Sequence, residues 1–477
     1  MPAGRLHVAV IVARGLRSAL ETSSDVSPEV TFMSSSKPSD GARHRSPVRE
    51  AILISVQVPG TSDADVARSL GELEHLLCGL GIRVVSTFVQ KREVRTLPAY
   101  VGDGKLAELA RITGGTGERT RGPDAPRADP KRPLRDDVVV VADDELTPGQ
   151  LRNLRAALGV EVLDRTAVIL RVFDARARTR EAKLEVELAR LEYELPRIRD
   201  DHSLGDREGG GGRASRGHSN VELAKQRARE RMAAVRRELS QAKAIADRRR
   251  LARADTFRVA LVGYTNAGKS SIMRQLTGSE VLVEDKLFAT LGTTVRPLAP
   301  SAAPPVLVAD TVGFLHRLPH TLMASFQSTL AEAHEASLLL NVVDASDPAF
   351  RSQLGVTQQV LAEIGAAGTP TWTVLNKVDR LSNEQRDALV AEYPEALLVS
   401  ALDARDGEHL RRRIDVFFAQ HLVERRFSLS YDRHAVLAEL RGELQVVEEE
   451  YGETLTITVR GTPEVVATLD ARLASAR

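Results

Sequence analysis

The chain has 477 residues, 42% hydrophobic and 27% charged, a globular composition with room for about three domains. Its 66 basic and 65 acidic residues leave a net charge of +1, which excludes a polycation and requires any basic surface to be local. The single cysteine, Cys78, excludes internal disulfides and cysteine-rich metal sites. Its apolar setting predicts a buried structural thiol rather than a reactive one. No stretch approaches the ~18 consecutive apolar residues of a membrane span.

Residues 1–49 match no expected element. His7–Val12 is apolar, but two arginines follow at once and no small-residue cleavage site comes after them, which disfavours a signal peptide. Ser23–Arg45 is rich in serine, proline and charge, as is typical of disorder. We therefore expect a disordered or mis-annotated N-terminal extension over 1–49, with Met33 as the true start of the protein.

Residues 50–175 predict an N-terminal α/β domain, because short apolar runs alternate with segments of helical spacing. The expected strands are Ile52–Val58, Arg83–Gln90, Val138–Val141 and Val160–Leu163, and the expected helices are Asp63–Leu80, a helix begun near Lys105, and Thr147–Leu158. Gly114–Pro133 is predicted to be a flexible insertion. Tyr100–Lys105, which reads YVGDGK, is expected to be an ordinary turn, with contact to an RNA phosphate or a second nucleotide as the alternative.

Residues 176–255 carry 21 basic and 14 acidic residues, a net charge of +7. Apolar residues recur at helical spacing in two runs, which predicts a basic antiparallel helical hairpin. The runs are Leu184, Leu188, Leu191 and Leu195, and then Ala228, Met232, Val235, Leu239, Ala242 and Ala246. Gly205–Gly217 between them is expected to be a mobile, non-helical tip. The charge favours contact with nucleic-acid phosphate, and a solvated helix surface is the alternative.

Residues 256–422 are organised around Gly263–Ser270, which reads GYTNAGKS. The apolar run Val259–Val262 precedes it and the helical start Ser271–Leu276 follows, so strand, glycine loop and helix N-terminus occur in the order that a P-loop needs. Backbone N–H groups of such a loop point at phosphate oxygens. Lys269 can reach the β- and γ-phosphates, and Ser270 can offer its hydroxyl to Mg²⁺.

Three further loops follow candidate strands in the same region. Asp310–Gly313 can hold Mg²⁺ or its water and donate an N–H to a γ-phosphate, and Asn376–Asp379 can read guanine through the carboxylate of Asp379. Lys377 can lay its aliphatic stem on the base, and Ser400–Leu402 can close over it. The order of these loops along the chain matches that of GTPases, which favours GTP over ATP. The predicted nucleotide-binding residues are Gly263, Tyr264, Thr265, Asn266, Ala267, Gly268, Lys269, Ser270, Ser271, Asp310, Thr311, Val312, Gly313, Asn376, Lys377, Asp379, Ser400, Ala401 and Leu402.

Residues 427–477 predict a small α+β module in which no chemistry is visible. Its expected elements are strand Phe427–Ser430, helix His434–Leu444, strands Gln445–Glu449 and Thr454–Val459, and helix Pro463–Leu473. The sequence as a whole therefore predicts an α/β multidomain protein. It has an N-terminal α/β domain with a basic hairpin, a central P-loop GTPase domain with a mostly parallel sheet and helices on both faces, and this C-terminal module.

Four motifs resemble the HflX family of ribosome-associated GTPases: GYTNAGKS at Gly263–Ser270, DKLFATL at Asp285–Leu291, DTVGFLHRLPH at Asp310–His320 and VVDASDP at Val342–Pro348. Leu163–Leu170 and Lys183–Ile198 resemble the family's lead into its helical hairpin, so the resemblance covers residues 50–477. It implies a cytoplasmic GTPase that binds the large ribosomal subunit or whole ribosomes and splits or rescues stalled ones under stress. It also implies that the hairpin tip approaches the peptidyl-transferase region, and some members are said to bind ATP through the N-terminal domain.

The sequence departs from the family pattern mildly after the P-loop lysine, where Ser270–Ser271 replaces the family's Ser/Thr pair, and more clearly in two other places. The family's tip reads GPGETQ, whereas Gly217–Glu222 reads GHSNVE. The family's switch I reads ATLDPT, whereas Ala289–Thr294 reads ATLGTT. By resemblance Thr294 falls on the Mg²⁺-sensing threonine, and the adjacent Thr293 is a rival.

The predicted mechanism relies on positioning and charge, as phosphoryl transfer generally does. Lys269, Thr294 and Gly313 are the expected catalytic residues, Ser270 and Thr294 the expected Mg²⁺ ligands, with Asp310 behind a metal-bound water. Phe314 stands where many GTPases have a water-orienting glutamine, so intrinsic hydrolysis should be slow, and a partner such as the ribosome would have to supply or order the missing group. The expected partners are the large ribosomal subunit, its RNA and GTP or GDP, for a monomer. A nucleotide-gated assembly factor with incidental hydrolysis and a signalling switch on protein partners are the alternatives.

Overall fold

The computed structural model describes residues 50–95, 98–118, 135–200, 213–251, 256–278, 294–300, 304–315, 332–431, 437, 440 and 442–475. The expected extension over 1–49, most of the insertion at 114–133, Thr293 and most of the helix expected at 434–444 lie outside the described residues. The chain divides into two compact units between Arg165 and Thr166, and each is described by itself.

The first unit contains a four-stranded parallel sheet with the order β2-β1-β3-β4. Its elements are β1 (Glu50–Gln57), α1 (Asp63–Gly79), β2 (Arg83–Lys91), α2 (Asp103–Thr113), β3 (Arg135–Ala142), α3 (Pro148–Leu158) and β4 (Val160–Asp164). Capping boxes begin two helices where the sequence predicts them, at Ser62 for α1 and at Thr147 for α3. The segment Tyr100–Lys105 is a turn up to Gly102 and enters α2 at Asp103; the Tyr100 hydroxyl accepts a hydrogen bond from Val56 N and donates one to Asp144, which anchors the turn to the sheet.

One prediction about this unit is wrong. Cys78 is exposed and free, not a buried thiol. It lies near the end of α1, where Leu73, Leu76 and Leu77 form the buried face, and one further residue of helix rotates Cys78 to the solvent side.

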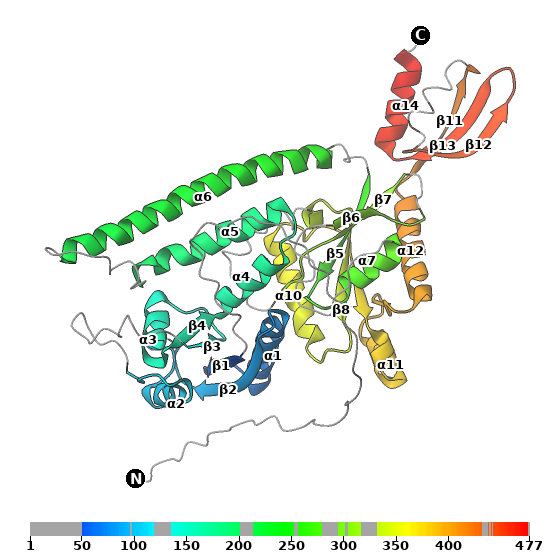
Figure 1. Ribbon diagram of the computed structural model, residues 1–477. Helices are drawn as coiled ribbons and strands as arrows, with labels where there is room; N and C mark the ends of the chain where they lie inside the picture. Colours follow the sequence, from blue (N-terminus) through cyan, green and yellow to red (C-terminus); the bar gives the residue numbers. More distant parts are fainter. Residues whose placement is uncertain are drawn as a thin grey trace, which may run out of the picture. The chain divides into compact units, whose positions relative to one another are not determined.

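The second unit begins within α4 (Arg165–Arg176), whose first residue is the last of the first unit. It continues with α5 (Arg180–Glu194), a 3₁₀ turn (Leu195–Asp200) and α6 (Arg213–Leu251). Helices α5 and α6 lie side by side as an antiparallel pair (Figure 1). Five of the predicted apolar positions form the buried seam between them: Leu184, Leu188, Met232, Val235 and Leu239. The predicted non-helical tip is too long at its C-terminal side, because α6 already begins at Arg213. A helix of 39 residues tolerates the single Gly217, which costs about 1 kcal/mol.

A six-stranded sheet follows, with the order β10-β9-β8-β5-β7-β6. All its neighbours are parallel except β6, which runs antiparallel to β7 at the edge. Its strands are β5 (Phe257–Gly263), β6 (Thr294–Pro297), β7 (Val306–Asp310), β8 (Leu338–Asp344), β9 (Thr371–Asn376) and β10 (Leu397–Leu398). The helices with them are α7 (Lys269–Thr277), α10 (Phe350–Glu363), a 3₁₀ turn (Val378–Arg380), α11 (Asn383–Glu392) and α12 (Ala404–Ala419).

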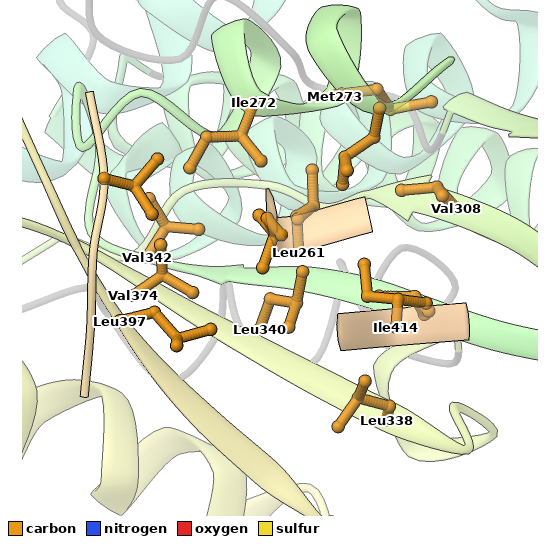
Figure 2. Close-up of a cluster of buried hydrophobic side chains, with 14 of the residues drawn as sticks. Leu261, Ile272, Met273, Val308, Leu338, Leu340, Val342, Val374, Leu397 and Ile414 are labelled. Carbon is orange, nitrogen blue, oxygen red and sulfur yellow. The ribbon is translucent and has the colours of Figure 1, made fainter. Parts of the chain in front are cut away.

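Apolar clusters cover both faces of this sheet. On one face, side chains of α7 and α12 pack on the central strands, where Ile272 and Ile414 belong to the same buried cluster as Leu340 (Figure 2). On the other, Leu361 of α10 packs with Leu339 and Phe314. Burial on both faces explains why the central strands are near-continuous apolar runs rather than alternating ones. The predicted mostly parallel sheet with helices on both faces is confirmed.

The C-terminal segment forms a three-stranded antiparallel sheet with the order β11-β13-β12. Its elements are β11 (Val423–Leu429), β12 (Gln445–Tyr451), β13 (Leu455–Gly461) and α14 (Pro463–Ser475). Alternate residues of β13, among them Ile457 and Val459, are buried together with Val466 and Leu469 of α14. Among the helices in the described part of the chain, none combines the length and apolarity needed to cross a membrane.

Candidate nucleotide site

The predicted loops meet at one edge of the six-stranded sheet. Strand register places Gly263 beside Val342, and Asp344 beside Asn376, so the carboxyl ends of β5, β8 and β9 lie next to one another. Asp310 ends β7 on the other side of β5. In an open α/β sheet this edge is where ligands bind.

The loop Gly263–Ser270 has a backbone that requires glycine at two points. Gly263 has φ +134°, and a Cβ there would lie 2.1 Å from the Val342 carbonyl oxygen. Gly268 has φ +94°, and a Cβ there would lie 2.1 Å from Nδ2 of Asn376. Gly268 is also the N-cap of α7 and gives no side-chain cap, which leaves the first N–H groups of the helix without a capping side chain. These features suit a loop that wraps an anion closely.

Lys269 is buried within this loop. Its ammonium donates to the carbonyl oxygens of Gly263 at 3.1 Å and Tyr264 at 2.8 Å. Burial lowers the pKa of Lys269 to about 8, although Asp310 acts to raise it. Because the charge of Asp310 does not offset the burial of the Lys269 ammonium, an anion bound beside it would be stabilised.

Three oxygen-bearing side chains gather near the end of β7. The Ser270 hydroxyl donates to Oδ2 of the fully buried Asp310 at 2.7 Å. Thr294 begins β6 and pairs directly with Asp310, so both side chains lie on the same face of the sheet. Hydroxyl and carboxylate oxygens fit Mg²⁺, which completes its shell with water and phosphate. Among the described residues no cluster of three histidine, cysteine or acidic side chains offers a different metal site.

The segment after Asp310 packs against the loop. Gly313 is so close that a Cβ would lie 2.9 Å from the Lys269 ammonium nitrogen. Phe314 pairs through its backbone, accepting from Thr265 N at 2.8 Å and donating to the Gly263 carbonyl at 3.0 Å. Its ring is 4% exposed in the apolar cluster with Tyr264, as expected for core packing of this segment.

Thr311 and Val312 turn their side chains inward. The Thr311 hydroxyl donates to the Leu261 carbonyl at 2.7 Å, and Val312 is buried. Only the backbone groups of these two residues remain for a ligand, which is a narrower role than the sequence alone predicts.

A single buried amide joins the phosphate loop to the base-reading loops. Asn376 donates from Nδ2 to the Ala267 carbonyl at 2.8 Å, and its Oδ1 accepts from Ala401 N at 3.0 Å. Ser400 bonds Oδ1 of the exposed Asp379 at 2.7 Å through its hydroxyl. Leu402 is 80% exposed at the end of this loop, where its side chain is available to a ligand.

Two acidic residues that the sequence analysis did not assign to the site hold these loops. Asp344 bonds the ammonium of Lys377 at 2.6 Å, and Asp406 accepts from Ser400 N at 2.8 Å. Asp344 lies in the VVDASDP motif, which signalled only a resemblance. Nothing in the sequence around Asp406, in the first turn of α12, separates it from an ordinary helix-start acid.

Comparison with known proteins gives matches along most of the chain. Three family models match: "GTP-binding GTPase N-terminal" at residues 67–174, "GTP-binding GTPase Middle Region" at 176–253 and "50S ribosome-binding GTPase" at 258–377. GTPase HflX of Gluconacetobacter diazotrophicus is 46% identical over 90% of this chain and 99% of its own length. The chain belongs to the HflX family of GTPases. GTPase HflX of Alkalihalophilus pseudofirmus is 35% identical over 85% of this chain and 92% of its own.

Among solved structures, a GTP-binding protein from Sulfolobus solfataricus in complex with GDP is similar at 23% identity. The match covers 78% of this chain and 99% of that chain, with a TM-score of 0.41. Membership of the HflX family makes this protein a GTPase. The ribosome-binding GTPase model ends at residue 377 and does not include Asp379 or Ser400–Leu402. These residues are connected to the rest of the site by two hydrogen bonds, from Ser400 to Asp379 and from Ala401 N to Asn376.

Proposed function

We propose that this HflX GTPase binds GTP and GDP at the edge formed by β5, β7, β8 and β9, with the residues predicted above. The buried Asn376 carries the proposal, because its one side chain ties the phosphate loop at Ala267 to the base loop at Ala401. A nucleotide lying across this edge would meet phosphate donors at one end and base-reading groups at the other.

Asp379 supports guanine as the base. Its carboxylate is exposed and oriented by the Ser400 hydroxyl, and a carboxylate can accept two N–H donors that guanine presents and adenine does not. Lys377 lies two residues before Asp379, and the exposed Leu402 lies two residues after Ser400, so both would contact the faces of the base.

Ser270 and Thr294 would hold Mg²⁺, with Asp310 orienting the Ser270 hydroxyl and a metal-bound water. When bound, the metal would neutralise charge on the β- and γ-phosphates. Lys269 would add a positive charge from a buried position, where electrostatic stabilisation is stronger than in water. Gly313 would offer its backbone N–H to the γ-phosphate. Phe314 is buried and apolar and cannot orient the attacking water, so intrinsic hydrolysis should be slow.

The proposed partner is the large ribosomal subunit or the whole ribosome, as part of a cytoplasmic, monomeric factor that splits or rescues stalled ribosomes under stress. Support comes from the 50S ribosome-binding description of the matched GTPase model and from the basic α5–α6 pair. We propose that residues 50–175, 176–255, 256–422 and 427–477 act as an N-terminal domain, a hairpin, the GTPase domain and a C-terminal module.

The test is GTP hydrolysis measured alone, with 50S and with 70S particles, together with sedimentation of the particles. The proposal expects slow hydrolysis alone, acceleration by ribosomal particles and conversion of 70S into subunits. Ribosome binding without acceleration would instead favour the assembly factor with incidental hydrolysis. Failure of the protein to associate with either particle would contradict both.

A further inference from the structure

Asp344, the last residue of β8, lies outside the four loops of the proposed site but contacts one of them. Its Oδ2 bonds the Lys377 ammonium at 2.6 Å. Its Oδ1 accepts two hydrogen bonds from Ser346, from the backbone N at 3.0 Å and the hydroxyl at 2.6 Å. We infer that Asp344 is a positioning residue for the guanine loop, which tethers the ammonium of Lys377 so that the aliphatic stem is held ready to pack on the base. The inference rests on the proposed nucleotide site.

The backbone brings the two residues together independently of their side chains. Asp344 pairs with Asn376 in the β8–β9 register, and Ala345 N donates to the Asn376 carbonyl at 2.9 Å. Lys377 follows with φ +62°, a left-handed conformation that residues other than glycine seldom adopt. The sheet register and this turn together direct Lys377 toward the end of β8.

The environment makes the ion pair stronger than a surface pair. The side chains of Lys377 and Asp344 are 16% and 17% exposed, so water screens their attraction less than at an open surface. The two bonds from Ser346 fix the carboxylate itself. Asp344 therefore offers Lys377 a preorganised anchor.

A tether is useful because lysine is among the side chains that lose most rotamer freedom when ordered. An anchored stem has lost that freedom before the nucleotide arrives, which raises affinity without any new contact to the base. Without Asp344 the same ammonium would be available to Asp379, the carboxylate that the base is proposed to need.

The experiment measures GDP and ADP affinity for the full chain carrying Asp344→Asn, Lys377→Met or both. We expect each single change to raise the Kd for GDP about tenfold, and the double variant to remain near tenfold rather than reach a hundredfold. For Asp344→Asn, whose changed residue lies outside the nucleotide-binding loops, the kcat at saturating GTP should stay unchanged. Loss of affinity at constant kcat is not expected from general damage to the fold.

Asp347→Asn is the matched control in the same loop. Its carboxylate accepts from Ala349 N at 2.8 Å and from Gln353 Nε2 at 2.7 Å, and so serves the start of α10. GDP affinity in this variant should stay within about twofold of wild type. Wild-type GDP affinity in Asp344→Asn, or factors that multiply in the double variant, would overturn the inference. A wild-type protein that does not prefer GDP to ADP would instead overturn the proposed nucleotide site.

Discussion

A buried phenylalanine occupies the position after Gly313, and its surroundings predict what a glutamine would do there. Phe314 is 4% exposed, and its backbone is paired with Gly263 and Thr265. In Phe314→Gln the amide would lie in an apolar cluster without partners, so we expect a loss of about 3 kcal/mol of stability and no gain in intrinsic kcat. Thermal denaturation and single-turnover hydrolysis measure the two effects, and Phe314→Leu serves as the apolar control. Faster hydrolysis by the glutamine variant would show that this position faces the substrate.

Asp379 is the residue on which base selectivity should depend. Asp379→Asn replaces two acceptor oxygens by one acceptor and one donor, so the variant should favour xanthosine triphosphate over GTP by about tenfold or more. Competition binding with the three nucleotides GTP, XTP and ATP measures the shift. Full retention of GTP selectivity would mean that the base is read elsewhere.

At the scale of elements, the apolar seam of the α5–α6 pair should matter far more than its surface charges. Val235 is fully buried in the cluster that contains Leu184 and Leu188, so Val235→Asp would bury a charge and should cost at least about 3 kcal/mol of hairpin stability. Arg231→Ala removes an exposed ion pair with Glu187 and should cost less than about 1 kcal/mol. Hydrogen exchange of α5 amides in both variants measures the difference. Equal protection in both would contradict the packing argument.

The elements that the sequence predicted well are those with a strong local signal. The strands around Gly263–Ser270 are apolar runs followed by polar or glycine-containing loops, and their order implies the parallel sheet. Strand β6 was missed because Thr294–Pro297 is a four-residue edge strand with no apolar run. The Asp344–Lys377 contact joins residues far apart in the chain and depends on the β8–β9 register, which no local pattern reveals. Cys78 could have been placed correctly, since it falls off the helical stripe of Leu70, Leu73 and Leu77.

At the scale of the whole molecule, charge is distributed unevenly. Residues 176–255 carry a net charge of +7 in a chain whose total is +1, so the remaining residues are net acidic. The basic segment 176–255 would attract a polyanion, whereas the net acidic remainder of the chain would repel it. This difference favours one orientation of the protein as it approaches RNA.

Charge reversal in this element tests whether it binds ribosomal RNA. Replacing Arg248, Arg249 and Arg250 near the end of α6 by Glu should weaken ribosome binding, because each phosphate contact releases counterions. The slope of log affinity against log salt should flatten by about 2 to 3. Removing residues 205–212, which precede α6, takes away two acidic residues and one arginine, so it should spare binding yet reduce splitting. GTP affinity should be unchanged in both variants, since Gly263–Ser270 is intact. Ribosome affinity measured at several salt concentrations tests whether these arginines bind RNA phosphate or only solvate the helix. Equal salt slopes for the wild type and the charge-reversal variant would mean that they only solvate the helix.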